Sequence, residues 1–191
     1  TNDAADRLAV DGAPHGTVVV GNAQTSGRGR MGRSWFSPRG AGLYVSVVLR
    51  PATFEPGVSL ASAVTLTAGV AIAEAIQAAT GLRPAIKWPN DLVVGRRKLC
   101  GILAAASTAG SSLRHVVLGY GVNVSDAAYP PEIADRATSL ETELGRPVAR
   151  AEVLAETLAR LSELLAPGNE PADGDVDARA AGRALARLLE R

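Results

Sequence analysis

The sequence predicts an α+β domain in which a mixed or antiparallel sheet carries its helices on one face. Two patterns predict this class: short apolar runs rich in β-branched residues follow one another across turns, and helical periodicity is confined to separate segments. In addition, 191 residues with 47% hydrophobic content are enough for one packed core. We therefore expect a globular domain whose sheet is built largely from consecutive strands.

The expected strands are short β-rich runs that end at turn residues, and the last three form an antiparallel meander. They lie at residues 17–24, 43–51, 84–94, 98–107 and 114–124. The clearest helix carries apolar residues at helical spacing over residues 59–80, with Ser59 as its N-cap and Gly81 as its C-cap. The other expected helices lie at 3–10, 150–165 and 177–191, the last after a polar linker at 166–177.

A segment rich in glycine and arginine, GRGRMGRSW at residues 27–35, is the most distinctive feature of the chain. It lies within residues 12–54, which hold five arginines and no acidic residue. A guanidinium group stays charged and offers a fork of donors that matches phosphate or carboxylate oxygens, and glycine lets the backbone approach a ligand closely. The segment therefore predicts an anion site, although a solvated basic loop has the same composition.

The spacing of Gly27, Gly29 and Gly32 also fits the G-x-G-x-x-G pattern of dinucleotide-binding folds. That pattern requires a helix to begin at the third glycine and a carboxylate about 20 residues later. Here Pro38 and two further glycines follow, and the next acidic residue is Glu55. We therefore reject a dinucleotide site and place these glycines in a loop between strands.

Composition disfavours several other classes of function. The net charge of +1 and the aromatic content of 4% disfavour nucleic-acid binding. The single cysteine, Cys100, cannot form an internal disulfide and is expected to be a small core residue, which fits a reducing compartment. We expect no apolar run that approaches the roughly 18 to 20 residues of a membrane span, and we find no signal-peptide pattern. The sequence thus predicts a cytoplasmic protein that does not act on a membrane.

A second motif, KWPND at residues 87–91, places a lysine beside a stiff turn. Because Pro89 disfavours helical geometry at the residue before it, Lys87 is projected from a strand end at a fixed angle. Lys98 follows eleven residues later, just before the tripeptide GIL. A lone lysine here would be solvated surface, and Asn90 would be an ordinary turn residue, so this motif alone leaves the function open.

Taken together, the motifs resemble the catalytic domain of biotin protein ligases, the biotin–[acetyl-CoA-carboxylase] ligases. The resemblance rests on Gln24 with GRGRMGRSW, on KWPND with Lys98 and GIL, and on GYGVNV at residues 119–124. It covers roughly residues 1–165 and keeps the order and spacing of the motifs. It implies a biotin/lipoate ligase-like fold of the class II synthetase type.

The resemblance also implies a reaction. Such ligases join biotin to ATP in the presence of Mg²⁺, which gives biotinyl-5′-AMP and pyrophosphate, and then transfer biotin to one lysine of a biotin carboxyl carrier domain of acetyl-CoA carboxylase or a related carboxylase. Two anions must be brought together, so the site needs dense positive charge that is already in place. No metal-ligand cluster is predicted from the residues themselves, and a homodimer is left open.

For biotin, the resemblance implies contacts from the arginine-rich loop and from strand ends. The implied biotin-binding residues are Thr1, Asn2, Gln24, Arg28, Gly29, Arg30, Lys87 and Asn123. Thr1 and Asn2 resemble the end of the family's Ser-Thr-Asn motif, whose serine is absent from this chain. With Gln24 they would meet the neutral ureido head of biotin, which needs donors and acceptors rather than charge. For Asn123, a turn-capping role is an equal alternative.

For the nucleotide, the implied residues are Arg30, Arg33, Trp35, Asn90 and Lys98. The implied catalytic residues are Lys87 and Arg30: the lysine would bridge the biotin carboxylate and the α-phosphate while the arginine holds phosphate. Trp35 would either stack on a base or close the loop onto the core.

The chain departs from the family pattern at both ends. Residues 1–165 are interpreted as the catalytic domain, with no room for the N-terminal DNA-binding domain of many members, so repressor function is not expected. Residues 166–191 are interpreted as a linker and helix in place of the usual SH3-like barrel, which leaves ATP affinity open. The alternatives are a degenerate biotin-binding module and a lipoate or octanoate ligase. The retention of Arg30 and Lys87 disfavours the first, and the composition of residues 27–35 disfavours the second.

Overall fold

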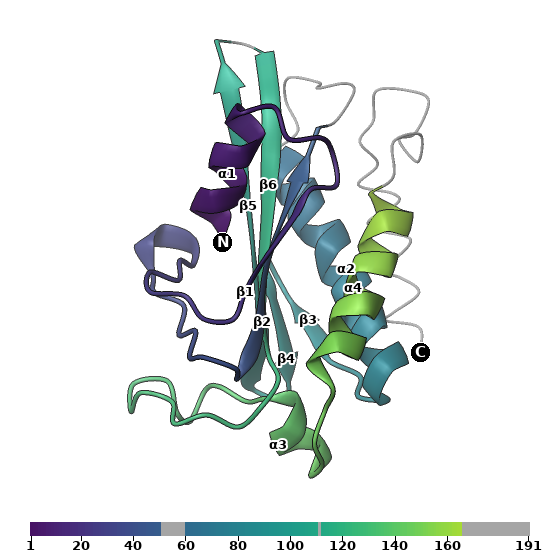
Figure 1. The fold of residues 1–191 in the computed structure, drawn as a ribbon. Coiled ribbons are helices and arrows are strands. Elements are labelled where there is room, and N and C mark those ends of the chain that lie inside the picture. Colours follow the sequence, from purple (N-terminus) through teal and green to yellow (C-terminus); the bar gives the residue numbers. More distant parts are fainter. Residues whose placement is uncertain (51–59, 111, 166–191) are drawn as a thin grey trace.

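A six-stranded antiparallel sheet forms the centre of the computed structural model, which describes residues 1–50, 60–110 and 112–165 (Figure 1). The strand order is β1-β2-β6-β5-β4-β3, and every neighbouring pair is antiparallel, so the antiparallel form of the predicted sheet is confirmed. The strands are β1 (Val18–Gly21), β2 (Gly42–Leu49), β3 (Ala85–Lys87), β4 (Asp91–Val94), β5 (Arg97–Ala109) and β6 (Ser112–Asn123). The helices are α1 (Asn2–Val10), α2 (Leu60–Thr80), α3 (Leu140–Leu144) and α4 (Arg150–Leu164), with one short 3-10 turn, η1 (Arg30–Gly32).

The main core lies between the sheet and the pair of helices α2 and α4, which run beside each other over one face (Figure 1). Because side chains alternate along a strand, every second residue of β2 and β6 points into this core. In β2 these residues are Leu43, Val45, Val47 and Leu49, and in β6 they are Val116, Leu118, Tyr120 and Val122. The residues between them point to the opposite face.

Helix α1 covers that opposite face, so the prediction that all helices lie on one face is wrong for this element. Ala5 and Ala9 of α1 pack against Val48 of β2 and Val117 of β6. These two valines lie between the residues that point into the main core, so they face the opposite side of the sheet. Small alanines let the helix approach the sheet closely, and nine residues cover only part of it. The face therefore stays open beyond the N-terminal end of α1, where the sequence motifs converge.

Helix α2 is more apolar than the sequence analysis expected. By length and composition it could cross a membrane, which corrects the expectation that no apolar run approaches that length. Length and composition do not separate a span from a core helix, however, and α2 packs on the sheet through Ala68, Ile72 and Ile76, all fully buried. Its predicted C-cap is confirmed, since Gly81 has a φ of 81° and its amide bonds the Gln77 carbonyl.

One helix escaped the sequence prediction. Helix α3 is a single short turn of helix bounded by Ser139, whose side chain accepts a hydrogen bond from the Thr142 amide, and by Gly145 in the left-handed region at φ 64°. Both capping signals are in the sequence, but five residues are too few to show periodicity. Ser59, the predicted linker and the predicted helix at 177–191 lie outside the described residues.

Candidate active site

A cavity of about 420 Å³ opens on the α1 side of the sheet, where the predicted motifs come together. It is bounded by the start of α1, the arginine-rich loop, the KWPND turn and the strands beneath them. All of the predicted site residues except Asn123 line it: Thr1, Asn2, Gln24, Arg28, Gly29, Arg30, Arg33, Trp35, Lys87, Asn90 and Lys98. Segments almost a hundred residues apart in the sequence thus form one pocket.

The floor of the cavity is a glycine-rich part of the sheet. Gly101 of β5 pairs with Gly121 of β6, and Gly119 lies two residues further along the same face. A Cβ at Gly119 would lie 2.2 Å from Asn2 Oδ1, and one at Gly121 would lie 2.5 Å from Trp35 Nε1. Because neither distance leaves room for a side chain, these glycines are needed for the close approach of Asn2 and Trp35.

One end of the cavity is lined by neutral hydrogen-bonding groups. Ser37 Oγ donates to Gln24 Oε1 at 2.7 Å, which fixes the amide so that Gln24 Nε2 donates to Thr1 Oγ1 at 3.0 Å. The buried hydroxyl of Ser46 contacts both Thr1 Oγ1 and Asn2 Oδ1. Both amides are thereby oriented, and the amide nitrogen of Asn2 keeps donors for a ligand, since no described residue accepts from it. This end suits a neutral polar group with a carbonyl oxygen.

The arginine-rich loop is a small hairpin held by its own backbone. The Trp35 amide bonds the Gly27 carbonyl at 2.8 Å, and the Gly29 amide bonds the Arg33 carbonyl at 2.7 Å. At the tip, Met31 and Gly32 both have positive φ, 57° and 72°. Met31 is also 89% exposed, so the tip offers its apolar side chain to solvent. The hairpin spreads its arginines along the rim of the cavity rather than burying them.

Two lysines enter the cavity from the far strands at different depths. Lys87 lies at the end of edge strand β3, directly opposite Asp91 of β4, and is exposed. Lys98, at the start of β5, is more buried and pairs with Asp91 Oδ1 at 2.7 Å. The strand register explains why Lys98 faces the cavity. In β4, Val93 pairs with Lys98 and Leu92 pairs with Cys100, so Leu99 of β5 is an extra residue without a partner, a β-bulge. The bulge turns both Leu99 and Cys100 into the core and places Lys98 on the site face.

Positive charge in the cavity greatly exceeds negative charge. Among the residues that the structure describes, Asp91 is the one acidic residue on the wall, and Lys98 neutralises it. Arg28 pairs with Asp3 of α1. No carboxylate among the described residues pairs with the remaining cations on the wall, which are Arg30, Arg33 and Lys87. Unpaired cations around one cavity repel one another, and an anion that binds there removes this repulsion.

Trp35 lies over the glycine floor between the two halves of the cavity. Lys98 Nζ is 5.2 Å from the centroid of its ring, within the range of a cation–π contact. The indole N–H of Trp35 is buried and has no hydrogen-bond acceptor among the described residues. In the structure the ring closes the loop onto the glycines of the sheet rather than onto the hydrophobic core, and stacking on a base stays a prediction.

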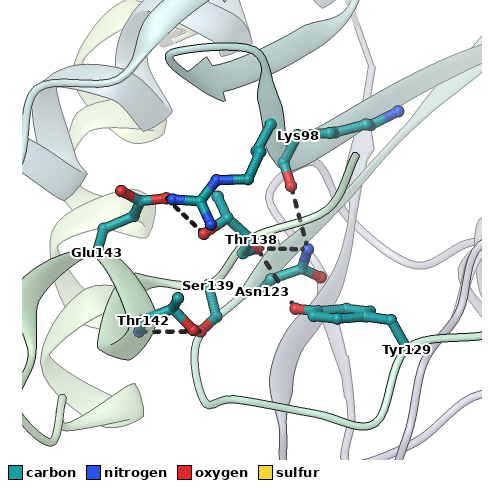
Figure 2. Close-up of polar contacts among 8 residues, drawn as sticks. Lys98, Asn123, Tyr129, Thr138, Ser139, Thr142 and Glu143 are labelled. Carbon is teal, nitrogen blue, oxygen red and sulfur yellow. Dashed lines mark hydrogen bonds and ion pairs between the residues drawn. The ribbon is translucent and has the colours of Figure 1, made fainter. Parts of the chain in front are cut away.

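Asn123 does not reach the cavity. Its amide nitrogen donates to the Thr138 carbonyl at 2.9 Å and lies 3.5 Å from the Lys98 carbonyl (Figure 2). The backbone of Lys98 is also tied to the 136–138 segment, since its amide bonds the Arg136 carbonyl and its carbonyl accepts from the Thr138 amide. The geometry thus gives Asn123 a structural role, as the sequence alternative allowed, while the side chain of Lys98 extends away from this cluster (Figure 2).

The same cluster fixes the segment that precedes α3. Thr138 Oγ1 donates to Glu143, which also accepts from Arg97 at 2.8 Å, and Tyr129 donates to the Thr138 carbonyl. Burial raises the pKa of Tyr129 to about 12, with smaller contributions from Asp126 and Tyr44, so its hydroxyl keeps its proton at neutral pH. The start of β5 is therefore held both by Asn123 of β6 and by the segment at residues 136–138.

Asn90 lines the cavity but uses part of its side chain for structure. Its amide nitrogen donates to the Ile102 carbonyl at 2.9 Å, and the Ile102 amide bonds the Asn90 carbonyl. These bonds close the KWPND turn onto β5. The side-chain oxygen of Asn90 is left for a ligand.

Sequence reasoning missed several residues of this site. Ser46 lies in an apolar strand and gave no motif signal, although a serine in the middle of LYVSVVLR is unusual enough to mark a buried polar site. Ser37 and Asp91 orient Gln24 and Lys98, and neither was among the predicted site residues. Gly119 and Gly121 were seen only as part of a motif, because nothing local shows what lies above a strand glycine.

Comparisons with known proteins agree with this geometry. A model described as the biotin/lipoate A/B protein ligase family matches residues 1–123. The bifunctional ligase/repressor BirA of Bacillus spizizenii is 39% identical over 160 residues, which are 83% of this chain and 48% of that protein. The biotin–[acetyl-CoA-carboxylase] ligase of Paracoccus denitrificans is 36% identical over 174 residues, which are 87% of this chain and 66% of that protein.

Solved structures resemble the chain over a similar range. The biotin protein ligase of Aquifex aeolicus in complex with biotin and ATP has a TM-score of 0.71 and 37% identity, over 84% of this chain and 65% of that one. The Leishmania major ligase in complex with biotinyl-5-AMP has a TM-score of 0.75 over 98% of this chain and 76% of that one, but its 20% identity shows the fold alone. The chain spans about half the length of the BirA proteins it matches. It belongs to the biotin/lipoate A/B protein ligase family.

Proposed function

We propose that this chain activates biotin with ATP, forming biotinyl-5′-AMP, and transfers biotin to a lysine of a biotin carboxyl carrier domain. One observation carries the proposal: a single cavity has neutral amide donors at one end and unpaired cations at the other. Biotin has this same polarity, with a neutral ureido head and a carboxylate at the end of its tail. The Paracoccus ligase named above and the Aquifex structure with biotin and ATP support the same reading.

In the first step, a carboxylate oxygen of biotin attacks the α-phosphorus of ATP. A bond forms between that oxygen and phosphorus, and the bond to the β-phosphate oxygen breaks, so that pyrophosphate leaves with the electron pair. Arg30 and Arg33 on the loop would hold phosphate oxygens, while Gln24 and Asn2 would orient the ureido head. The cations lower the barrier because they are in place before the charge develops and need no reorganisation.

The two lysines offer alternative bridges between the biotin carboxylate and the α-phosphate. The resemblance assigns this role to Lys87, which is exposed at the edge of the sheet. The geometry also favours Lys98, because it lies over Gly101 at the centre of the floor and its ammonium group is already oriented by Asp91. We propose that Lys98 contacts the reacting carboxylate and that Lys87 contacts the outer phosphates.

In the second step, the lysine amine of the carrier attacks the carbonyl carbon of the mixed anhydride. An amide bond forms as the amine nitrogen loses a proton to solvent, the bond from this carbon to the phosphate oxygen breaks, and AMP leaves with the electron pair. The rim of the cavity, formed by the arginine-rich loop and by Trp88, which is 76% exposed, is the entrance available to that lysine. We also propose that the protein acts in the cytoplasm, because its single cysteine fits a reducing compartment.

The donor set fits a Mg²⁺ ion that is bound mainly through the substrate. Asp91 and the side-chain oxygen of Asn90 are the oxygen ligands available beside the cations, and Mg²⁺ commonly takes one or two protein oxygens and completes its shell with phosphates and water. When bound, the ion would neutralise phosphate charge. The described residues contain no group of three acidic, histidine or cysteine side chains that would hold a metal without the nucleotide.

Pyrophosphate release tests the proposal directly. The chain is incubated with Mg-ATP and biotin, lipoate or octanoate, and then with a carrier domain whose mass is measured. We expect pyrophosphate release with biotin but not with lipoate or octanoate, and we expect the mass of the carrier domain to increase by one biotin. Release with lipoate or octanoate would transfer the assignment to another ligase of the family, and biotin binding without release would make the chain a binding module.

A further inference from the structure

We infer that the hydrogen bond between buried His115 and exposed Asp6 positions α1, and with it Thr1 and Asn2, at the head end of the cavity. His115 Nε2 lies 2.8 Å from Asp6 Oδ1, and the histidine is only 1% exposed. Because an ionised carboxylate only accepts hydrogen bonds, the histidine nitrogen donates. Neither residue lines the cavity, so this pair acts through the helix.

Polar contacts hold α1 at three points: Asn2, Asp6, and the Ala9 carbonyl, which accepts from Arg50 Nη2 at 2.6 Å. Asn2 and Asp6 are four residues apart, one turn of the helix, so both point down onto the sheet. Asn2 lies on Gly119, and Asp6 lies on His115, four residues earlier in the same strand. Two anchors at separate points of one strand fix the direction of the helix axis as well as its height.

The contact between these anchors cannot fix the helix by itself. It consists of Ala5 and Ala9 on Val48 and Val117, small apolar groups whose attraction is not directional. Such a surface tolerates a shift of the helix along the strand, whereas a hydrogen bond to a charged acceptor does not. A buried histidine also loses its partner if the helix moves, and an unsatisfied buried polar group is costly.

Position matters at this helix because its first two residues form the head end of the cavity. Thr1 Oγ1 lies between Gln24 and Ser46, and Asn2 contacts Ser46. A small displacement of α1 would break this network and would move Asp3, the partner of Arg28, but it would leave the lysines of β3 and β5 where they are. The inference rests on the proposed function and predicts a selective defect: weaker biotin binding with ATP binding retained.

The test compares Asp6→Ala with two other variants of α1 in the complete chain. Asp6→Asn keeps an oxygen acceptor for His115, and Asp11→Ala removes a carboxylate at the end of the same helix that does not bond the histidine. Biotin and ATP affinities are measured by calorimetry, and amide hydrogen exchange reports the Ala5 amide, which bonds the Thr1 carbonyl. A role in stability alone would not weaken one ligand selectively in protein that is still folded.

We expect Asp6→Ala to weaken biotin binding about tenfold, to change ATP affinity less than twofold and to speed exchange at Ala5. Asp6→Asn should recover most of the biotin affinity, and Asp11→Ala should match the wild type. Equal losses for both ligands, or unchanged biotin affinity with unchanged exchange, would overturn the inference. If Asp6→Ala does not fold, Asp6→Ser, too short to reach His115, is judged by the same criteria.

The inference and the proposed function fail in different ways. A wild-type chain that binds no biotin refutes the proposed function, yet the exchange of the Ala5 amide still reports whether Asp6 holds the helix. If the wild type binds biotin and the Asp6→Ala variant binds it equally tightly, the inference is refuted and the proposed function stays intact.

Discussion

Substitution of Gly119 by alanine gives the sharpest test of the cavity geometry. The added Cβ would lie 2.2 Å from Asn2 Oδ1 and 2.7 Å from its Nδ2, whereas ordinary contacts begin near 3.4 Å. The Asn2 amide must therefore retreat by more than 1 Å from the head end of the cavity. A misplacement of this size in a substrate-positioning group costs roughly a hundredfold in rate. We expect kcat/KM for biotin to fall by this factor, equivalent to about 2.7 kcal/mol of transition-state stabilisation.

Biotin-dependent pyrophosphate release measures this loss, and Gly69→Ala is the matched control. Gly69 lies inside α2, where a Cβ would meet only Ile102 Cδ1 at 3.6 Å, an ordinary contact. Because alanine is the better helix former, this control should gain about 0.5 to 1 kcal/mol in the free energy of unfolding and keep its activity. A folded Gly119→Ala variant with kcat/KM within threefold of the wild type would refute the assignment of Asn2 to the head end.

Three further predictions concern charge, motion and the thiol. Lys98→Ala should lower kcat for adenylation by at least a hundredfold, whereas Lys87→Ala should act mainly on KM for ATP, both measured by pyrophosphate release; the reverse pattern would return the bridging role to Lys87. The glycines and like charges of the arginine-rich loop predict that it is mobile without ligand and closes over bound biotin and ATP. Hydrogen exchange of the amides of residues 25–40 should therefore be slower when both ligands are present, and equal exchange rates would contradict closure of the loop. Burial raises the pKa of the Cys100 thiol, so iodoacetamide at pH 8 to 9 should label the unfolded chain and spare the folded one; labelling without unfolding would contradict the core position.

The sign of the Cys100 effect extends to stability. Its folded pKa lies above the unfolded value of 9.0, so the folded state retains the proton longer than the unfolded state. The resulting contribution to stability is complete below pH 9 and declines as the pH rises above 9, where the unfolded thiol ionises. Cys100→Ala should weaken the pH dependence of unfolding in that range.

Most of the strands and three of the helices could be predicted because their signals are local. Runs of β-branched residues and the C-cap of α2 depend on neighbours within a few positions, and these features appear close to where they were expected. The side of the sheet that each helix covers is not local. Helix α1 lies opposite α2 because Val48 and Val117 have the other parity to the residues of the main core, and this relation appears only when the strands are paired.

The predictions for Asn123 and Lys98 show where site prediction from sequence ends. Asn123 has the same parity as Gly119 and Gly121, so alternation alone places it in the row of the floor. The strand continues past the edge of the cavity, however, and Thr138, fifteen residues away in sequence, takes its amide. Lys98 is the opposite case: it lines the cavity as predicted, although regular alternation from Gly101 would turn it away from the site and only the bulge at Leu99 returns it.

The same bulge explains how one short hairpin serves both the core and the reaction. Leu99 and Cys100 are consecutive and both fully buried, so β5 is anchored in the core immediately beside Lys98. Asp91 of the neighbouring strand β4 then holds the ammonium group of Lys98 over Gly101. A lysine on such an anchor loses little freedom when a substrate binds, whereas the exposed Lys87 must be ordered by the substrate itself. This difference in preorganisation is the physical reason to expect an effect on kcat from the first lysine and an effect on KM from the second.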